Sequence, residues 1–199
     1  GVPAWVEGEL RRYLECGILA HGFARARCSE CAHDFLVAFS CKGRGVCPSC
    51  NARRMVEVAA HMVENVFPRL PVRQWVLSFP KRLRYFLERD AKLAGRVLRV
   101  FLRVVEATLR AASPDAPADA RFGGVTFVQR FGSALNHHLH FHCCLIDGVF
   151  AADGDGMRFF EATGLDERRV ATVQEAVRGQ VLDLFEKEGL LDDEATANM

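Results

Sequence analysis

Four of the seven histidines of this 199-residue chain fall within six residues, between positions 137 and 142. His138, His140 and His142 would share one face of a β-strand, because side chains alternate between faces, while the apolar residues between them would share the other. Imidazoles two residues apart on a strand can converge on one divalent ion, whereas on a helix they would diverge by about 200°. A half-buried strand whose polar face is satisfied by water and neighbouring groups is the alternative. The clustering favours a metal site.

A second group of candidate ligands is formed by cysteines, six of the eight lying between residues 16 and 50. Two C-x2-C pairs, Cys28 with Cys31 and Cys47 with Cys50, are separated by 15 residues. This spacing is typical of four-cysteine zinc sites, and clustered cysteines without a secretion signal indicate metal more than disulfides. We therefore expect these four thiolates to hold a structural Zn²⁺ ion.

Other residues near the two pairs leave alternatives open. Cys41 is a possible exchange partner or the ligand of a second ion, and Cys16, His21 and His33 are weaker candidates. A redox C-x-x-C pair is the competing interpretation, although paired knuckles are unusual for that chemistry. Four basic residues lie close in sequence to the second pair: Lys42, Arg44, Arg53 and Arg54. They are consistent with a zinc module that contacts DNA and also with one that only caps the fold.

The net charge of +1 hides a strong asymmetry along the chain. Residues 68 to 112 hold 11 Lys or Arg against 3 acids, and residues 151 to 199 hold 5 against 12. A phosphate backbone is the natural partner of the basic segment, although solvated charge is the commoner meaning of a charge run. The candidate DNA contacts in this segment are Lys81, Arg82 and Arg84, which are interleaved with Tyr85 and Phe86, and Arg96, Arg99 and Arg103, which form one stripe along a helix.

The elements that must position these groups can be predicted from periodicity and turn residues. Helices are expected at 3–15, 51–67, 91–112 and 166–188. Strands are expected at 35–39, at 73–79, at 124–131, along the histidine segment, and in short runs at 149–150 and 157–160. The last four suggest a largely antiparallel sheet. The sequence thus predicts an α+β chain with a zinc-ribbon module and connecting helix at 1–67 and a sheet with flanking helices at 68–199.

Three segments resemble a known family: 124–150, which contains the histidines, 39–50 around the second cysteine pair, and 71–80. They are similar to the transposases of rolling-circle insertion sequences and of common-region elements, which belong to the HUH endonuclease superfamily. His140-Phe141-His142 corresponds to the His-hydrophobic-His motif that names the superfamily. The resemblance covers nearly the whole chain. It implies an RRM-like or palm-like antiparallel sheet in which strand 73–79 lies beside the histidine strand.

The resemblance also implies a chemistry. A divalent ion, Mg²⁺ or Mn²⁺, would be held by His140, His142 and a third polar ligand, and would polarise the scissile phosphate while a tyrosine attacks it. Gln129 is the first choice for the third ligand, followed by Asn136 and His138. The expected partner is DNA, as single strands or hairpin element ends, in recombination by transposition. No apolar run approaches the length of a membrane span, so a cytoplasmic, nucleoid-associated bacterial protein is expected.

The sequence departs from the family at the nucleophile. Tyr13 and Tyr85 are the only tyrosines and both precede the histidine strand, whereas the family carries its catalytic tyrosines on a later helix. We do not expect Tyr85 to replace them. A domain that is incomplete before the tyrosine helix would bind metal and DNA without cleaving it. Two alternatives stay open: a non-catalytic zinc-dependent DNA-binding module, and a metal-dependent hydrolase using His138, His140 and His142.

Overall fold

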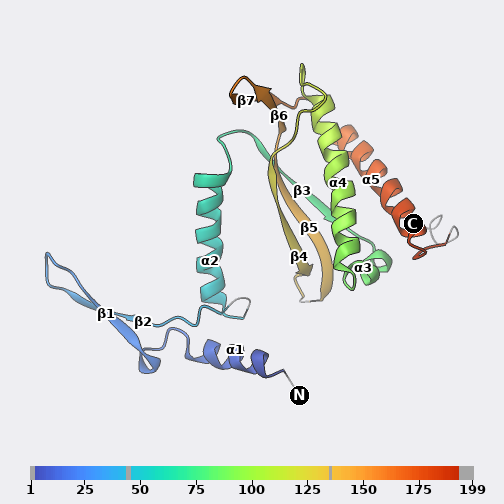
Figure 1. Cartoon of the computed structure of the whole chain (residues 1–199). Coiled ribbons are helices and arrows are strands. Elements are labelled where there is room, and N and C mark those ends of the chain that lie inside the picture. Colours follow the sequence, from blue (N-terminus) through green and yellow to red (C-terminus); the bar gives the residue numbers. More distant parts are fainter. Residues whose placement is uncertain (1–2, 44–45, 135, 193–199) are drawn as a thin grey trace. The chain divides into compact units, whose positions relative to one another are not determined.

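The computed structural model describes residues 3–43, 46–134 and 136–192. The chain divides into two compact units, Gly1–Pro68 and Arg69–Met199, which are described separately (Figure 1). Both units combine helices with antiparallel strands, so the predicted α+β class is confirmed. No helix among the described residues is long and apolar enough to cross a membrane.

The first unit consists of helices and one small hairpin. Its elements are α1 (Ala4–Glu15), the 3-10 turn η1 (Leu19–His21), β1 (Phe23–Arg27), β2 (Asp34–Ala38), α2 (Pro48–His61) and the π-helical turn η2 (Met62–Val66). The antiparallel pair β1–β2 runs from Phe23 opposite Ala38 to Arg27 opposite Asp34. Only β2 was predicted, because the alternating Ala and Arg of β1 have low strand propensity. Helix α2 begins three residues earlier than predicted, at Pro48, since proline is well accommodated at the first helical position.

The second unit is organised around the histidine strand. Its elements are β3 (Val72–Ser78), α3 (Lys81–Leu87), α4 (Ala91–Ala112), β4 (Gly124–Phe131), β5 (His137–Ile146), β6 (Gly148–Asp153), β7 (Gly156–Glu161) and α5 (Glu167–Lys187). A three-stranded antiparallel sheet has the order β3-β5-β4, so β5 is central and β3 lies beside it, as expected from the resemblance.

The strands after β5 do not join this sheet, although the sequence suggested one largely antiparallel arrangement. β6 and β7 pair only with each other among the named strands of the described chain. The turn at Asp147 and Gly148 redirects the chain here, and Asp147 donates its N–H to the carbonyl of Pro71. A β-carbon at Gly148 would lie 2.3 Å from the carbonyl oxygen of Phe160, so the close approach of the two new strands requires glycine.

One face of the sheet is covered and the other is open. Leu139, Phe141 and Cys143 of β5 point into the core, where they are at most 2% exposed. They belong to one cluster with apolar residues of α4, such as Val97 and Val105, and of α5, such as Phe185. Because side chains alternate, His138, His140 and His142 occupy the opposite face, where each is partly exposed. Burial of the apolar face therefore fixes which face presents the histidines.

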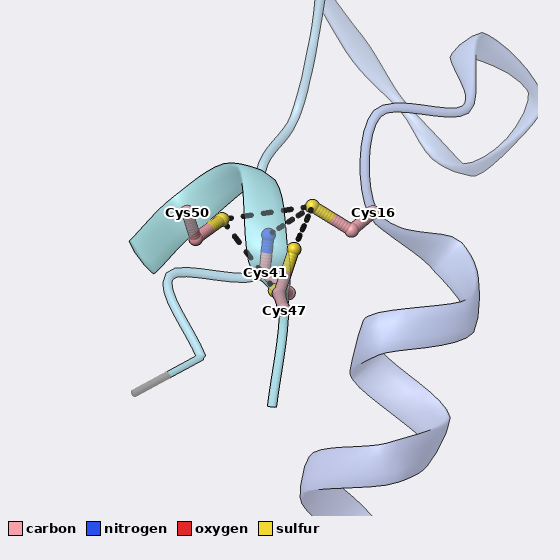
Figure 2. Close-up of side chains that lie close together, drawn as sticks. All are labelled: Cys16, Cys41, Cys47 and Cys50. Carbon is pink, nitrogen blue, oxygen red and sulfur yellow. Dashed lines mark hydrogen bonds between the residues drawn. The ribbon is translucent and has the colours of Figure 1, made fainter. Parts of the chain in front are cut away.

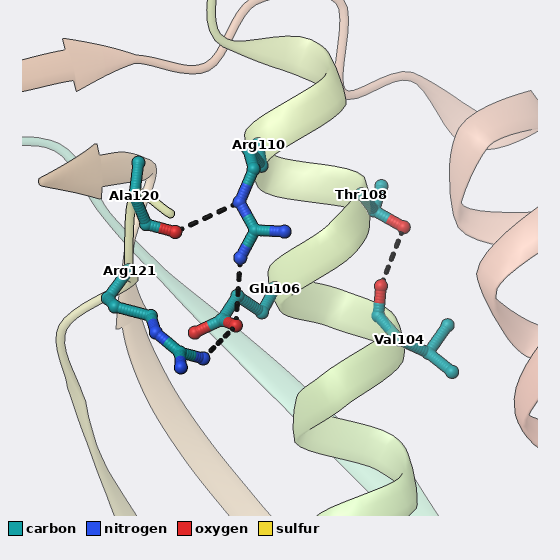
Figure 3. A network of polar contacts seen from close by, with 6 residues as sticks. All are labelled: Val104, Glu106, Thr108, Arg110, Ala120 and Arg121. Carbon is teal, nitrogen blue, oxygen red and sulfur yellow. Dashed lines mark hydrogen bonds and ion pairs between the residues drawn. The ribbon is translucent and has the colours of Figure 1, made fainter. Parts of the chain in front are cut away.

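A polar network fastens the loop before β4 onto α4 (Figure 3). Glu106 accepts hydrogen bonds from Arg110 and Arg121, each at 2.9 Å, and its side chain is only 13% exposed. Arg110 also donates Nε to the carbonyl of Ala120 at 2.9 Å. These contacts connect the loop to the helix just before β4 begins, and so help to set where β4 enters the sheet.

Candidate metal centres and nucleic-acid surface

Four thiols meet in the first unit, from segments that are distant in the sequence (Figure 2). Cys16 follows α1, Cys41 follows β2, and Cys47 and Cys50 lie at the start of α2. Their sulfur atoms all lie within 4.8 Å of one another. Cys16 Sγ is 3.6 Å from Cys47 Sγ and 3.7 Å from Cys50 Sγ, and Cys41 Sγ is 3.7 Å from Cys50 Sγ.

These separations fit a tetrahedral zinc ion. Zinc–thiolate bonds are about 2.3 Å long, so sulfurs at the corners of a regular tetrahedron lie about 3.8 Å apart. In addition, backbone amides point at the sulfurs: Cys41 donates its N–H to Cys16 Sγ at 3.4 Å, and Gly43 donates to Cys41 Sγ at 3.3 Å. Such N–H donors stabilise thiolate charge and orient the ligands. The group therefore has the composition and geometry of a closed structural site.

Acidity differs among these thiols. The N–H of Cys50 hydrogen-bonds to Cys47 and is the main cause that lowers the pKa of Cys47 to about 7. Cys16 differs, because the N–H of Cys41 lowers its pKa but the adjacent thiols Cys47 and Cys41, with burial, outweigh this and raise it to about 12. Without metal Cys47 therefore loses its proton more readily than Cys16, and an ion bound by all four thiolates must displace the protons that remain.

The structure separates the four zinc ligands expected from the spacing. Cys47 and Cys50 join Cys16 and Cys41, whereas Cys28 and Cys31 lie in the turn between β1 and β2 and are not in the cluster. The reason is the length of the hairpin, since five residues of strand extend about 17 Å and place its turn far from its base. In that turn the N–H groups of Cys31 and Glu30 hydrogen-bond to Cys28 and lower its pKa.

The histidines on β5 form a row on the open face of the sheet. The ring centroids of His138 and His140 are 5.0 Å apart, as are those of His140 and His142. Among the described residues, the cysteine cluster is the only set of three or more His, Cys, Asp or Glu whose ligand atoms lie mutually within 4.8 Å. The three histidines therefore do not enclose a common site, which disfavours a hydrolase centre built from them alone.

Neighbouring strands place polar groups beside this row. Gln129 of β4 and Ser78 of β3 are both directly opposite His140, so the three side chains share the open face. Asn136 and His137 lie at the start of β5. His137 shares a strand face with Leu139, which is the face opposite to that of His138, His140 and His142. Of the third ligands expected, Gln129 is thus the one directly across from the motif.

Two hydrogen bonds orient the motif imidazoles. Nδ1 of His140 lies 2.7 Å from the carbonyl oxygen of His138, and because a carbonyl only accepts, Nδ1 carries the proton and Nε2 is left with a lone pair. His142 Nδ1 lies 2.5 Å from the side-chain amide of Gln74, a residue that the sequence did not single out. Exchanging the amide oxygen and nitrogen of Gln74 lets the oxygen accept a hydrogen bond from the N–H of Nδ1, which gives His142 the same tautomer.

The two tyrosines lie in different units. Tyr13 lies on α1 in the first unit, and Tyr85 lies on α3, where the guanidinium of Arg89 is 3.8 Å from its ring centroid. Tyr85 is 55% exposed and packs edge-on against Phe86. The structure therefore places Tyr85 in a cationic surface on α3.

The basic side chains expected to contact DNA are found in different settings. In the first unit Lys42, Arg53 and Arg54 are exposed, with Arg53 paired to Glu57 at 3.0 Å, while Arg44 lies outside the described residues. In the second unit Lys81 and Arg82 are exposed and Arg84 is half-buried. On α4, Arg96 pairs with Glu188 and Arg103 donates to Gln180 of α5, whereas Arg99 is exposed. Two members of the predicted α4 stripe are thus engaged by α5.

Two stretches of the chain match known protein families. Residues 1–79 match the family described as "Transposase zinc-binding domain", and residues 123–199 match the family described as "Putative transposase". A protein of Sinorhizobium fredii named "Putative transposase y4qJ" is 26% identical over 144 residues, which are 70% of this chain and 34% of that protein. The chain spans about a third of the length of this relative. No solved structure matches the chain. The chain is therefore similar to transposases over most of its length, with a match to a transposase zinc-binding domain followed by a match to a transposase family.

Proposed function

We propose that the second unit is the metal- and DNA-binding part of an HUH-type transposase that cleaves and transfers single DNA strands during rolling-circle transposition. The observation that carries this proposal is the pair His140 and His142, adjacent on the open face of β5, with Gln129 directly opposite His140. Two imidazoles and one amide leave room in the coordination shell of Mg²⁺ or Mn²⁺ for phosphate oxygens.

Hydrogen bonds within the chain would orient the two histidines for metal binding before DNA binds. Nε2 of His140 points its lone pair away from the strand because Nδ1 is engaged by the carbonyl of His138. Gln74 would hold His142 in the matching tautomer. When bound, the divalent ion would withdraw charge from a scissile phosphate. The nucleophilic tyrosine would be supplied by a part of the transposase that is not within these 199 residues, an idea consistent with the greater length of the relative.

The first unit would contribute a zinc-stabilised module. Cys16, Cys41, Cys47 and Cys50 are the ligands we propose for Zn²⁺. The exposed Lys42, Arg53 and Arg54 near the second cysteine pair, together with Arg44, would contact DNA phosphates. In the second unit the exposed Lys81, Arg82 and Arg99 and the half-buried Arg84 would do the same, whereas Arg96 and Arg103 would first have to leave their partners on α5.

Manganese binding tests the proposed site. We expect the zinc-loaded chain to bind one Mn²⁺ ion, detected by the loss of the free-ion EPR signal, and His140→Ala to abolish this binding without changing the zinc content. Gln129→Ala should weaken it about tenfold or more, as removal of one ligand does. His61→Ala, on the exposed surface of α2, is the matched control. Equal manganese affinity of His140→Ala and the unaltered chain would refute the site.

A further inference from the structure

A pocket of about 560 Å³ lies between α3 and the start of β5. One side of it is lined by Lys81, Arg84 and Tyr85 of α3 and by Glu88 and Arg89, which directly follow the helix. Asn136 and His137 close it from the other side. All of these residues belong to the second unit, so the pocket is formed within one folded body.

The lining is cationic and carries one aromatic face. Lys81, Arg84 and Arg89 contribute three positive charges against the single negative charge of Glu88. Arg89 is held in place, because it donates Nη1 to the carbonyl of Tyr85 at 2.8 Å while its guanidinium stacks over the Tyr85 ring. This arrangement creates an exposed aromatic and guanidinium surface on which a planar group can stack.

Two residues that line the pocket, Arg84 and Glu88, carry buried polar atoms. Arg84 Nε and Glu88 Oε1 are buried and have no hydrogen-bond partner among the described residues. Glu88 Oε2 lies 3.9 Å from His137 Nδ1, and the Glu88 side chain is 17% exposed. A charged lining with unmet hydrogen-bonding capacity suits a polar ligand better than an apolar one.

The pocket adjoins the histidine row. His137 lines the pocket and directly precedes His138, the first histidine of the row. The ring of His138 lies 5.0 Å from that of His140. If one phosphate of a polymer bound at His140, a neighbouring monomer of that polymer would thus lie close to the pocket.

We propose that this pocket is a nucleotide subsite of the transposase, which binds one phosphate and one unpaired base of single-stranded DNA beside the His140 site. Lys81, Arg84 and Arg89 hold the phosphate, and the Tyr85–Arg89 stack accepts the base. Asn136 presents an amide, which can both donate to and accept from a base edge. A paired base could not stack in this way, so the subsite selects unpaired strands. The inference rests on the proposed function for the identity of the polymer, but it does not require the divalent ion.

The test measures binding of the full zinc-loaded chain to a labelled oligothymidylate without Mg²⁺ or Mn²⁺, over a range of salt concentrations. Lys81→Gln/Arg89→Gln should reduce the slope of log affinity against log salt by about 1.4, because each contact to single-stranded phosphate contributes about 0.7. Both side chains are exposed, so the fold should survive their replacement. Arg168→Gln/Lys187→Gln on α5 removes two equally exposed cations and should leave the slope unchanged. An unchanged slope in Lys81→Gln/Arg89→Gln would overturn the subsite.

Base stacking is tested separately. Tyr85→Ala should weaken binding to oligothymidylate about fivefold or more, and should not change binding to an abasic strand of the same length. Equal losses on the two strands would rule out a base in the pocket. The double variant His140→Ala/His142→Ala should retain the same slope contribution from Lys81 and Arg89. A variant that loses manganese binding but keeps the salt slope is therefore defective in the His140 site. A variant that keeps manganese binding but has a reduced salt slope is defective in the pocket.

Discussion

The side-chain amide of Gln74 lies 2.5 Å from Nδ1 of His142, joining β3 to the histidine strand. A partner on Nδ1 fixes the tautomer of a metal-binding histidine and raises its basicity, and its loss typically lowers metal affinity about 10- to 100-fold. We therefore expect Gln74→Leu to weaken Mn²⁺ binding about tenfold while His142 itself stays in place. Isothermal titration would measure the change. Gln174→Leu, an exposed position on α5, is the matched control, and equal affinities of the two variants would contradict the role of Gln74.

Zinc binding should depend on Cys16 and not on Cys28. Cys16→Ser removes one of the four clustered sulfurs, and because structural zinc contributes on the order of 10 kcal/mol to small modules, the first unit should lose its metal and unfold. Cys28→Ser changes a thiol at the hairpin turn and should keep the ion bound by the cluster. Native mass spectrometry of the two variants decides between the ligand sets. Retention of zinc by Cys16→Ser together with its loss from Cys28→Ser would restore the set expected from the sequence.

Much of the fold could be predicted because local pattern and tertiary burial agree. Helix α4 and strand β4 have the predicted bounds, since α4 carries apolar residues at helical spacing along one face and β4 lies between glycines. The side chain of Asp90 caps α4 by accepting the N–H groups of Lys92 and Leu93. Such signals act within a few residues of sequence, where no knowledge of the fold is needed.

The metal centres needed information that the sequence does not carry locally. The spacing of Cys47 and Cys50 identifies a knuckle, but its partners depend on where the β1–β2 hairpin brings the chain back, and that brings Cys41 and Cys16. In the same way, Gln74 reaches His142 only through the register of β3 against β5. A hairpin of different length would bring other residues to Cys47 and Cys50, although the cysteine motif itself would be unchanged. A register shifted by one residue would likewise remove Gln74 from His142 without changing the histidine motif.

Glu106 should contribute measurably to the stability of the second unit. It is mostly buried and binds both Arg110 and Arg121, so Glu106→Ala leaves two guanidinium groups without their acceptor. We expect a loss of about 2 kcal/mol in the free energy of unfolding. Urea unfolding followed by the fluorescence of buried Trp75, in a Trp5→Phe background, reports on this unit. Glu175→Ala, which removes an exposed carboxylate from α5, should change stability by less than about 0.5 kcal/mol.

On α4, Arg99 should contribute more to DNA binding than Arg96 or Arg103. Arg96 pairs with Glu188 and Arg103 donates to Gln180, whereas the side chain of Arg99 has no such partner among the described residues. Arg99 and Arg103 are both exposed. We expect Arg99→Gln to reduce the salt slope for single-stranded DNA by about 0.7, and Arg96→Gln/Arg103→Gln to leave it nearly unchanged. Fluorescence anisotropy at several salt concentrations measures both. A reduction of about 2 when all three are replaced, shared equally among them, would mean that the stripe opens away from α5 to meet DNA.

The remaining prediction concerns the nucleophile. In the proposed site His140 and His142 would hold an ion and orient a phosphate, but positioning without a suitably placed tyrosine offers no route to a 5′-phosphotyrosyl intermediate. We expect this chain, given Mn²⁺ and a single-stranded oligonucleotide carrying an element end, to bind the DNA without forming a covalent adduct. A longer transposase chain that includes a later tyrosine-bearing helix should form the adduct, and His140→Ala in that longer chain should abolish it. A denaturing gel measures adduct formation directly. An adduct formed by the 199 residues and lost in Tyr85→Phe would instead make Tyr85 the nucleophile and the α3 pocket part of the cleavage site.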